Sequence, residues 1–134
     1  MDTKKLLKYG DKLLTTLIIL FFIITILFKV RYIQTGSMKP TLQVGAVVYV
    51  NPFSYSESRK PGIGDVAMYR SLTGMEYIHR IVDVTEDGKY IFKGDNNSTK
   101  DFSPVPLSNI EGKVVIEVNF IAPVVRTIRH LEDN

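Results

Sequence analysis

The sequence predicts a mainly β protein, a small antiparallel β-barrel or folded-sheet domain preceded by one N-terminal transmembrane helix. An apolar run at residues 13–28 contains no charge, proline or glycine. After this run, short stretches rich in β-branched and aromatic residues alternate with polar segments that contain glycine or proline, which is typical of strands and turns. About a hundred residues follow the run, which is enough for one domain with one core.

The apolar run, LLTTLIILFFIITILF, approaches the length that crosses a membrane. At about 1.5 Å per residue, a helix of about 16 to 18 residues covers roughly 24 to 27 Å of the hydrocarbon layer. Lys12 and Lys29 flank the run, and their long side chains can reach the two interfaces. A cleavable secretory signal is the alternative, but no small-x-small cleavage pattern follows. We therefore assign residues 13–30 to a transmembrane anchor.

The charges around this anchor predict its orientation. Four lysines lie within residues 1–12, whereas two cations, Lys29 and Arg31, follow the apolar run closely. The positive-inside rule therefore predicts a cytoplasmic segment at 1–12 and an extracytoplasmic domain at 31–134. That domain has twelve basic and twelve acidic side chains, so the net charge of +3 comes from the N-terminal flank and Lys29. Without clustered positive charge, nucleic-acid binding is not expected.

Five stretches of the domain have the composition of strands, and we predict them at 44–51, 65–70, 76–84, 89–93 and 113–120. Asp87-Gly88 predicts a hairpin with a type I′ turn, in which both central residues have positive φ. Residues 54–64 and 96–106 are predicted loops. The charged tail, 122–134, is compatible with a short amphipathic helix.

Ser37 is the candidate nucleophile. It lies in QTGSMKPTL, a few residues beyond the anchor and therefore close to the bilayer surface. A serine attacks a carbonyl only when a base takes its proton and nearby donors hold the oxyanion that forms. Gly36 permits close approach of the backbone on one side, and Pro40 restricts the chain on the other. Most loop serines are only solvated or capping, so other residues must support this assignment.

His79 is the candidate base. Strand alternation within 76–84 places it on one face with Ile81. Imidazoles titrate near neutral pH, which suits proton transfer, although a lone strand histidine is more often structural. The other histidine, His130, lies in the charged tail. A carboxylate would be needed to orient the imidazole, and KGDNNSTKD offers both Asp95 and Asp101.

The composition also limits which kinds of catalysis and metal binding are possible. The sequence has no cysteine, which excludes disulfides, thiolate catalysis and cysteine-ligated metals. Metal catalysis has little support, because His79 has no suitable second histidine and the acids are scattered. We therefore expect no cofactor and no metal.

Three blocks of the sequence together resemble the type I signal peptidases, membrane-anchored serine proteases that remove signal peptides from translocated proteins. TGSMKPTL is similar to the nucleophile box of that family, YIHRIV to its general-base box and KGDNN to its acidic box. Their order after one anchor is also the expected one. His79 stands where most bacterial members carry lysine, so the resemblance is to the Ser-His branch with the endoplasmic-reticulum and archaeal enzymes.

The resemblance implies a role for each candidate residue. Ser37 would be the nucleophile and His79 the general base, with Asp95 and Asp101 as functional acids between which the sequence does not choose. Thr35 and the amide of Ser37 would hold the oxyanion. Met38 would pack toward the membrane, where a thioether inserts at little cost.

The implied partners are the lipid bilayer, the protein translocation machinery, and preproteins with small residues at the first and third positions before the cut. Two alternatives to a Ser-His peptidase stay open. Lys39 or Lys93 would be the base in a Ser-Lys enzyme. A catalytically inactive, membrane-tethered β-domain would instead be a subunit or adaptor of a secretion complex.

Overall fold

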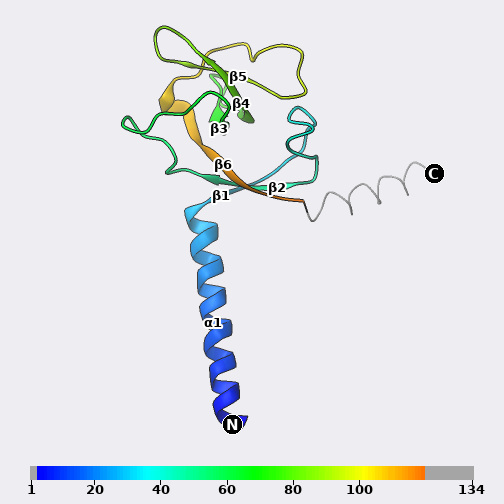
Figure 1. Cartoon of the computed structure of the whole chain (residues 1–134), viewed down its shortest axis with the longest axis vertical. Coiled ribbons are helices and arrows are strands. Elements are labelled where there is room, and N and C mark those ends of the chain that lie inside the picture. The colour runs from blue at the N-terminus through cyan, green and yellow to red at the C-terminus, as the bar shows by residue number, and fades with distance from the viewer. Residues whose placement is uncertain (1–2, 120–134) are drawn as a thin grey trace, which may run out of the picture.

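The structure combines one long helix with one six-stranded sheet (Figure 1). It is a computed structural model that describes residues 3–119. The expected helix at 122–134 and His130 lie outside the described residues. The helix is α1 (Thr3–Leu27), and the strands are β1 (Lys29–Tyr32), β2 (Val47–Asn51), β3 (Val66–Arg70), β4 (Glu76–Val84), β5 (Tyr90–Lys93) and β6 (Ile110–Val118), with a short 3-10 helix at Leu107–Asn109 before β6.

All neighbouring strands of the sheet pair antiparallel, in the order β1-β2-β6-β3-β4-β5. The sheet curls into a half-barrel, which confirms the predicted mainly β fold. The five predicted strands are present, with ends displaced by up to three residues. β1 was not predicted, because KVRY is short and half of it is cationic. Its two cations are accommodated by ion pairs across the curled sheet, Lys29 with Glu111 and Arg31 with Glu76.

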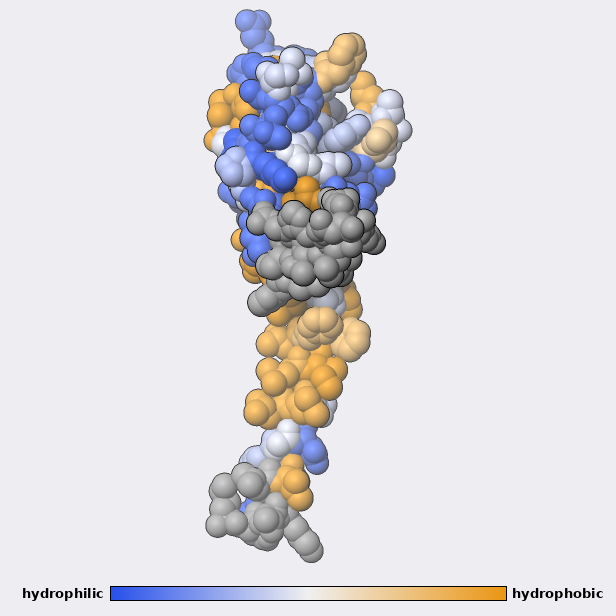
Figure 2. Space-filling model, turned by 90° about the vertical axis from the view of Figure 1, so that its right-hand side faces the viewer, coloured by the Kyte–Doolittle hydropathy of each residue, from blue (hydrophilic) through white to orange (hydrophobic). Residues whose placement is uncertain are grey.

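Helix α1 differs in extent from the predicted anchor. It begins at Thr3 and ends at Leu27, and Val30 belongs to β1, where it pairs with Tyr49. The 21 residues from Leu7 to Leu27 are apolar enough to cross a membrane, and at about 1.5 Å per residue they extend about 31 Å. Figure 2 shows this apolar surface between hydrophilic residues near the start of the helix and the more hydrophilic domain. The helix therefore fits a membrane anchor.

The hairpin between β4 and β5 is confirmed, but its predicted type I′ turn is wrong. Gly88 has a φ of +77°, and no residue other than glycine has positive φ in the described chain. The N–H of Gly88 donates to the carbonyl of Thr85, and the N–H of Thr85 donates to the carbonyl of Lys89. A three-residue loop with only its last residue left-handed explains this geometry, so Asp87 keeps an ordinary conformation.

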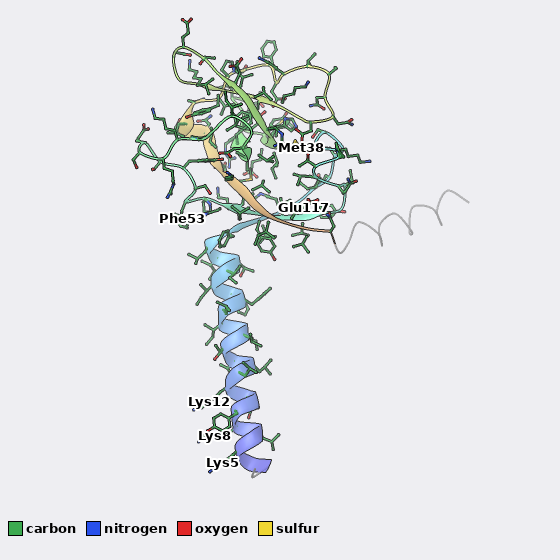
Figure 3. The ribbon with its side chains drawn as sticks, in the orientation of Figure 1. Lys5, Lys8, Lys12, Met38, Phe53 and Glu117 are labelled. Atoms are coloured by element: carbon green, nitrogen blue, oxygen red, sulfur yellow. The ribbon has the colours of Figure 1, made fainter. Side chains whose placement is uncertain are left out.

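Two apolar clusters form the core. One contains Ile33, Met38, Leu42, Ala46, Val48, Val50 and Met68, and the other contains Ala67, Tyr69, Ile81, Tyr90, Phe92 and Val105. Met38 is only 2% exposed, so the prediction that it packs toward the membrane is wrong. It lies inside the domain, on the side of β6 away from α1 (Figure 3). Because Met38 is buried, the segment that contains Ser37 is attached to the core.

The opposite face of β1, β2 and β6, here called the apolar outer face, is also apolar. Val48 and Val50 point into the core, so strand alternation turns Val47 and Tyr49 outward. The register places the six residues of this face in two rows, Val30-Tyr49-Ile116 and Tyr32-Val47-Val118. These strands form the base of the domain beside the end of α1 (Figure 1). The apolar outer face therefore lies on the side of the anchor helix.

Gly112→Ala is expected to lower the free energy of unfolding by at least about 2 kcal/mol. Gly112 has a φ of +149°, and an added Cβ would clash with the carbonyl oxygen of Asn51. Denaturant unfolding of the detergent-solubilised protein measures the loss. Gly74→Ala is the control, because Gly74 also has positive φ but has open space around it. Equal losses in the two variants would contradict the role given to the close contact.

Candidate active site

Ser37 and His79 meet although they are far apart in the sequence. Ser37 Oγ lies 3.0 Å from Nε2 of His79, which β4 presents from its buried face. His79 is only 6% exposed, so the imidazole is held inside the domain. The direct contact allows the imidazole to take the hydroxyl proton during attack on a carbonyl.

Asp101 makes the second contact of the imidazole. Its Oδ2 lies 2.7 Å from Nδ1 of His79. An ionised carboxylate accepts only, so Nδ1 carries the proton and Nε2 is left to accept the hydroxyl of Ser37. Burial would raise the pKa of Asp101, but hydrogen bonds from His79 and Tyr69 outweigh it and hold this pKa below its ordinary value. The arrangement keeps a negative charge beside the imidazole.

Asp95 lies elsewhere, although the sequence did not separate it from Asp101. Its two carboxylate oxygens accept from Nε and Nη2 of Arg80 at 2.8 and 2.7 Å. It also accepts a hydrogen bond from Thr41, in the turn that follows Ser37. Arg80 follows His79 in β4 and therefore points to the opposite face. Asp95 thus fastens two segments of the site together, and only Asp101 contacts the imidazole.

The turn after β5 also holds the backbone of Ser37. The N–H of Asn96 donates to the carbonyl of Ser37 at 2.8 Å. Gly94 packs against the same carbonyl, and a Cβ added there would lie 2.7 Å from its oxygen. The block KGDNN therefore contributes a tight backbone contact with the nucleophile segment as well as the Asp95 carboxylate.

Thr35 lies on the other side of Ser37, with 3.3 Å between the two hydroxyl oxygens. Among residues 3–119, the N–H of Ser37 donates to no acceptor. The N–H and the Thr35 hydroxyl are thus two donors beside the Ser37 hydroxyl, the arrangement that holding an oxyanion would require.

Neither alternative lysine base reaches the nucleophile. Within the described chain, no hydrogen bond joins Lys39 or Lys93 to Ser37. Lys93 pairs with Arg80 in the register of β4 and β5, so it lies on the face opposite His79. Residues 3–119 also contain no group of three or more acidic or histidine side chains that could hold a metal.

Tyr69 is a contact of the site that the sequence reasoning missed. Its hydroxyl donates to Oδ2 of Asp101 at 2.6 Å. Strand alternation in β3 places Ala67 and Tyr69 on one face, but it contains no information about the loop that brings Asp101 above them. No signal in the sequence could have identified this pair.

Acidification is expected to weaken the ion pair between Asp95 and Arg80. The Arg80 guanidinium lowers the pKa of Asp95 below its ordinary value, against an opposing effect of burial. A carboxyl with a lowered folded-state pKa adds stability above its ordinary pKa, and this stability is lost as the pH falls through the folded-state value.

Asp95→Asn should therefore lower the Tm at pH 7 by about 4 to 8 °C, the shift that about 1 kcal/mol produces in a domain of this size. At a pH low enough to protonate the Asp95 carboxyl in the folded parent, the parent and the variant should unfold together. Circular dichroism at both pH values measures the difference, with the exposed Glu86→Gln as control. An equal difference at both pH values would contradict the charged pair.

A serine hydroxyl, an imidazole and a carboxylate in a hydrogen-bonded series define the class of proteins that activate serine for attack on a carbonyl. Here the series lies on a small β domain with an apolar N-terminal helix. The family described as signal peptidase, peptidase S26, matches residues 6–87, which is more than half of the chain. This chain belongs to that family. The match contains Ser37 and His79 and ends before Asp95 and Asp101.

Several relatives share this family's name. Signal peptidase I W of Bacillus subtilis (strain 168) is 30% identical over 90 residues, which cover 64% of this chain and 46% of that protein. Signal peptidase I of Pseudomonas fluorescens is 35% identical over 95 residues, 61% of this chain and 34% of the relative. Signal peptidase I of Pseudomonas aeruginosa is 33% identical with the same shares. The chain therefore spans about half of the first relative and about a third of the others.

Proposed function

We propose that this protein is a membrane-anchored serine endopeptidase that removes N-terminal signal peptides from translocated preproteins at the membrane surface. The observation that carries the proposal is the hydrogen-bonded series of Ser37, His79 and Asp101 in a chain of the signal peptidase family. Histidine in the general-base box, with no lysine at the nucleophile among the described residues, favours the Ser-His branch over a Ser-Lys enzyme.

The proposed reaction is acyl transfer through Ser37. Its Oγ attacks the scissile carbonyl while Nε2 of His79 takes the hydroxyl proton, and Asp101 stabilises the imidazolium that forms. The Ser37 N–H and the Thr35 hydroxyl hold the oxyanion. His79 then gives the proton to the leaving amine, and water releases the signal peptide from Ser37 by the reverse sequence of proton transfers.

Three features support cleavage at the membrane surface. Helix α1 is long and apolar enough to serve as the anchor. Only β1 and a short turn separate its last residue, Leu27, from Ser37. The apolar outer face lies beside the end of the helix, together with Phe53, which is 63% exposed (Figure 3). An apolar base rests in the interfacial region of a bilayer more favourably than in water. The domain would then rest against the surface at which signal peptides leave the hydrocarbon.

The proposed orientation places the N-terminus in the cytoplasm and the catalytic domain outside. Lys5, Lys8 and Lys12 lie at the end of α1 that is far from the domain (Figure 3). The two cations at the domain end, Lys29 and Arg31, form ion pairs with Glu111 and Glu76. Lysines that form no ion pair within residues 3–119 thus flank the anchor at its N-terminal end, and this bias favours the topology. The translocation machinery would then deliver the preproteins to the same side of the membrane.

Cleavage of a defined preprotein by the full chain in detergent or liposomes tests the proposal. Mass spectrometry of the products should show one cut, directly after a small residue. An extended substrate turns its first and third residues before the cut to the same side, and its second residue away. A bulky side chain at the first position should therefore reduce kcat/KM at least about 100-fold, whereas the same change at the second position is the control. Absence of any cleavage would favour the inactive adaptor.

A further inference from the structure

We infer that Tyr69 is a positioning residue of this active site, whose hydroxyl fixes the carboxylate of Asp101 so that Asp101 can orient His79. The inference rests on the proposed function, because it assigns Tyr69 a part in the same reaction. Neither the family resemblance nor the sequence pattern identifies this residue. The contacts and the packing support it, and the charges of the two groups agree with them.

Two hydrogen bonds meet at one oxygen atom of the Asp101 carboxylate. The hydroxyl of Tyr69 lies 2.6 Å from Oδ2 of Asp101, and Nδ1 of His79 lies 2.7 Å from the same oxygen. Two donors that approach one carboxylate oxygen from two strands restrict the rotation of the carboxylate. The N–H of Asp101 also donates to the carbonyl of Phe92 at 2.8 Å, which fixes the backbone of this residue. The hydroxyl of Tyr69 thus completes the restraint on the side chain.

Packing makes Tyr69 a rigid support. It is 3% exposed, and its ring stacks on Phe92 and on Tyr77 with centroid distances of 4.2 and 5.6 Å. In the register of β3 and β4, Tyr69 lies opposite Tyr77, and the small, fully buried Ala67 lies opposite His79. Tyr69 and His79 therefore share one face of the sheet as diagonal neighbours. The hydroxyl reaches Asp101 from a ring that has little freedom to move.

The charges determine which group donates. Burial raises the pKa of Tyr69, and the hydrogen bond to Asp101 raises it further, so its hydroxyl stays protonated. Hydrogen bonds from His79 and Tyr69 lower the pKa of Asp101 in spite of its burial. Tyr69 therefore donates to an anion, and it favours the ionised Asp101 that a protonated His79 needs. Tyr77 is the other titratable group beside Tyr69.

Tyr69→Phe removes only the hydroxyl and keeps the stacked ring. Tyr69 and Asp101 line a cavity of about 310 Å³, so a smaller side chain would enlarge an existing space and confuse the result with lost packing. Tyr77→Phe is the matched control. Tyr77 belongs to the same stack, but its hydroxyl contacts the sulfur of Met75 at 3.7 Å and makes no hydrogen bond to Asp101.

The first measurement is steady-state cleavage of the preprotein. Loss of a hydrogen bond to a charged group should reduce kcat about 10- to 100-fold in Tyr69→Phe, with KM changed less than about twofold. Tyr77→Phe should match the parent within about twofold. An unchanged kcat in Tyr69→Phe, or an equal loss in both variants, would overturn the inference.

The second measurement is a double-mutant cycle with Asp101→Asn. If Tyr69 acts through Asp101, Tyr69→Phe should have less than about a threefold effect once the carboxylate is absent. A hydroxyl that only stabilises the fold would reduce activity by the same factor in both backgrounds. If the reduction in activity of the double variant equalled the product of the reductions in Tyr69→Phe and Asp101→Asn, the inference would be overturned.

The third measurement does not depend on catalysis. The carboxyl carbon of Asp101, followed by NMR in detergent, should titrate at a higher pH in Tyr69→Phe than in the parent, because one donor to the anion is lost. Tyr77→Phe should leave this titration unchanged. An unchanged titration in Tyr69→Phe overturns the inference even if the enzyme is active. Conversely, a shifted titration in a protein without Ser37-dependent cleavage contradicts the proposed peptidase and leaves the Tyr69 contact established.

Discussion

Ser37→Ala is expected to reduce kcat for signal-peptide cleavage roughly 10⁴- to 10⁶-fold. The change removes the oxygen that attacks the carbonyl in the proposed reaction, while Thr35, His79 and the backbone donors stay in place. Because Met38 and the carbonyl of Ser37 hold this segment, the fold should be retained. The same labelled preprotein, with products counted over long incubations, measures the residual rate.

The matched control is Ser108→Ala. Ser108 is exposed, and its hydroxyl donates to the neighbouring Asn109 at 3.3 Å. This variant should cleave at the parent rate. Thermal unfolding of all three proteins should agree within a few degrees, so that the loss reflects chemistry. Cleavage by Ser37→Ala at more than about a hundredth of the parent rate would remove Ser37 as the nucleophile.

His79→Ala is expected to cost about as much as Ser37→Ala, because the two residues act as one unit. Without the imidazole, no base among the described residues lies within reach of the Ser37 hydroxyl. The double variant should therefore be no slower than either single variant. If the fold reduction in kcat of the double variant equalled the product of the two single reductions, His79 and Ser37 would contribute separately.

His79→Lys sharpens this test. A lysine at this position would lie beside the Asp101 carboxylate, which favours the charged ammonium and prevents it from acting as a base. We expect this variant to be as inactive as His79→Ala. Ser37-dependent cleavage in His79→Ala would instead indicate a lysine base such as Lys39, whereas cleavage in His79→Lys alone would show that the introduced lysine serves as the base. Near-UV circular dichroism of each variant checks that the buried aromatic residues keep their packing.

The two acids show where reasoning from the sequence stopped. Asp95 and Asp101 lie six residues apart in one polar segment, and both matched the expected chemistry equally well. Asp101 faces the imidazole because its N–H pairs with Phe92 of β5, which sets the direction of the loop. Asp95 meets Arg80 because that side chain lies on the other face of β4. These directions depend on pairing between distant segments.

The sequence by itself predicted the apolar helix, the five main strands and the two segments that carry Ser37 and His79. These features are local, because hydropathy and strand alternation record which side chains must avoid water. Only the tertiary structure decided that Lys29–Tyr32 forms a strand, that Met38 enters the core, and that Asp101 and Tyr69 meet behind His79. Such contacts depend on strand register and loop direction, which are fixed only when segments far apart in the chain pack together.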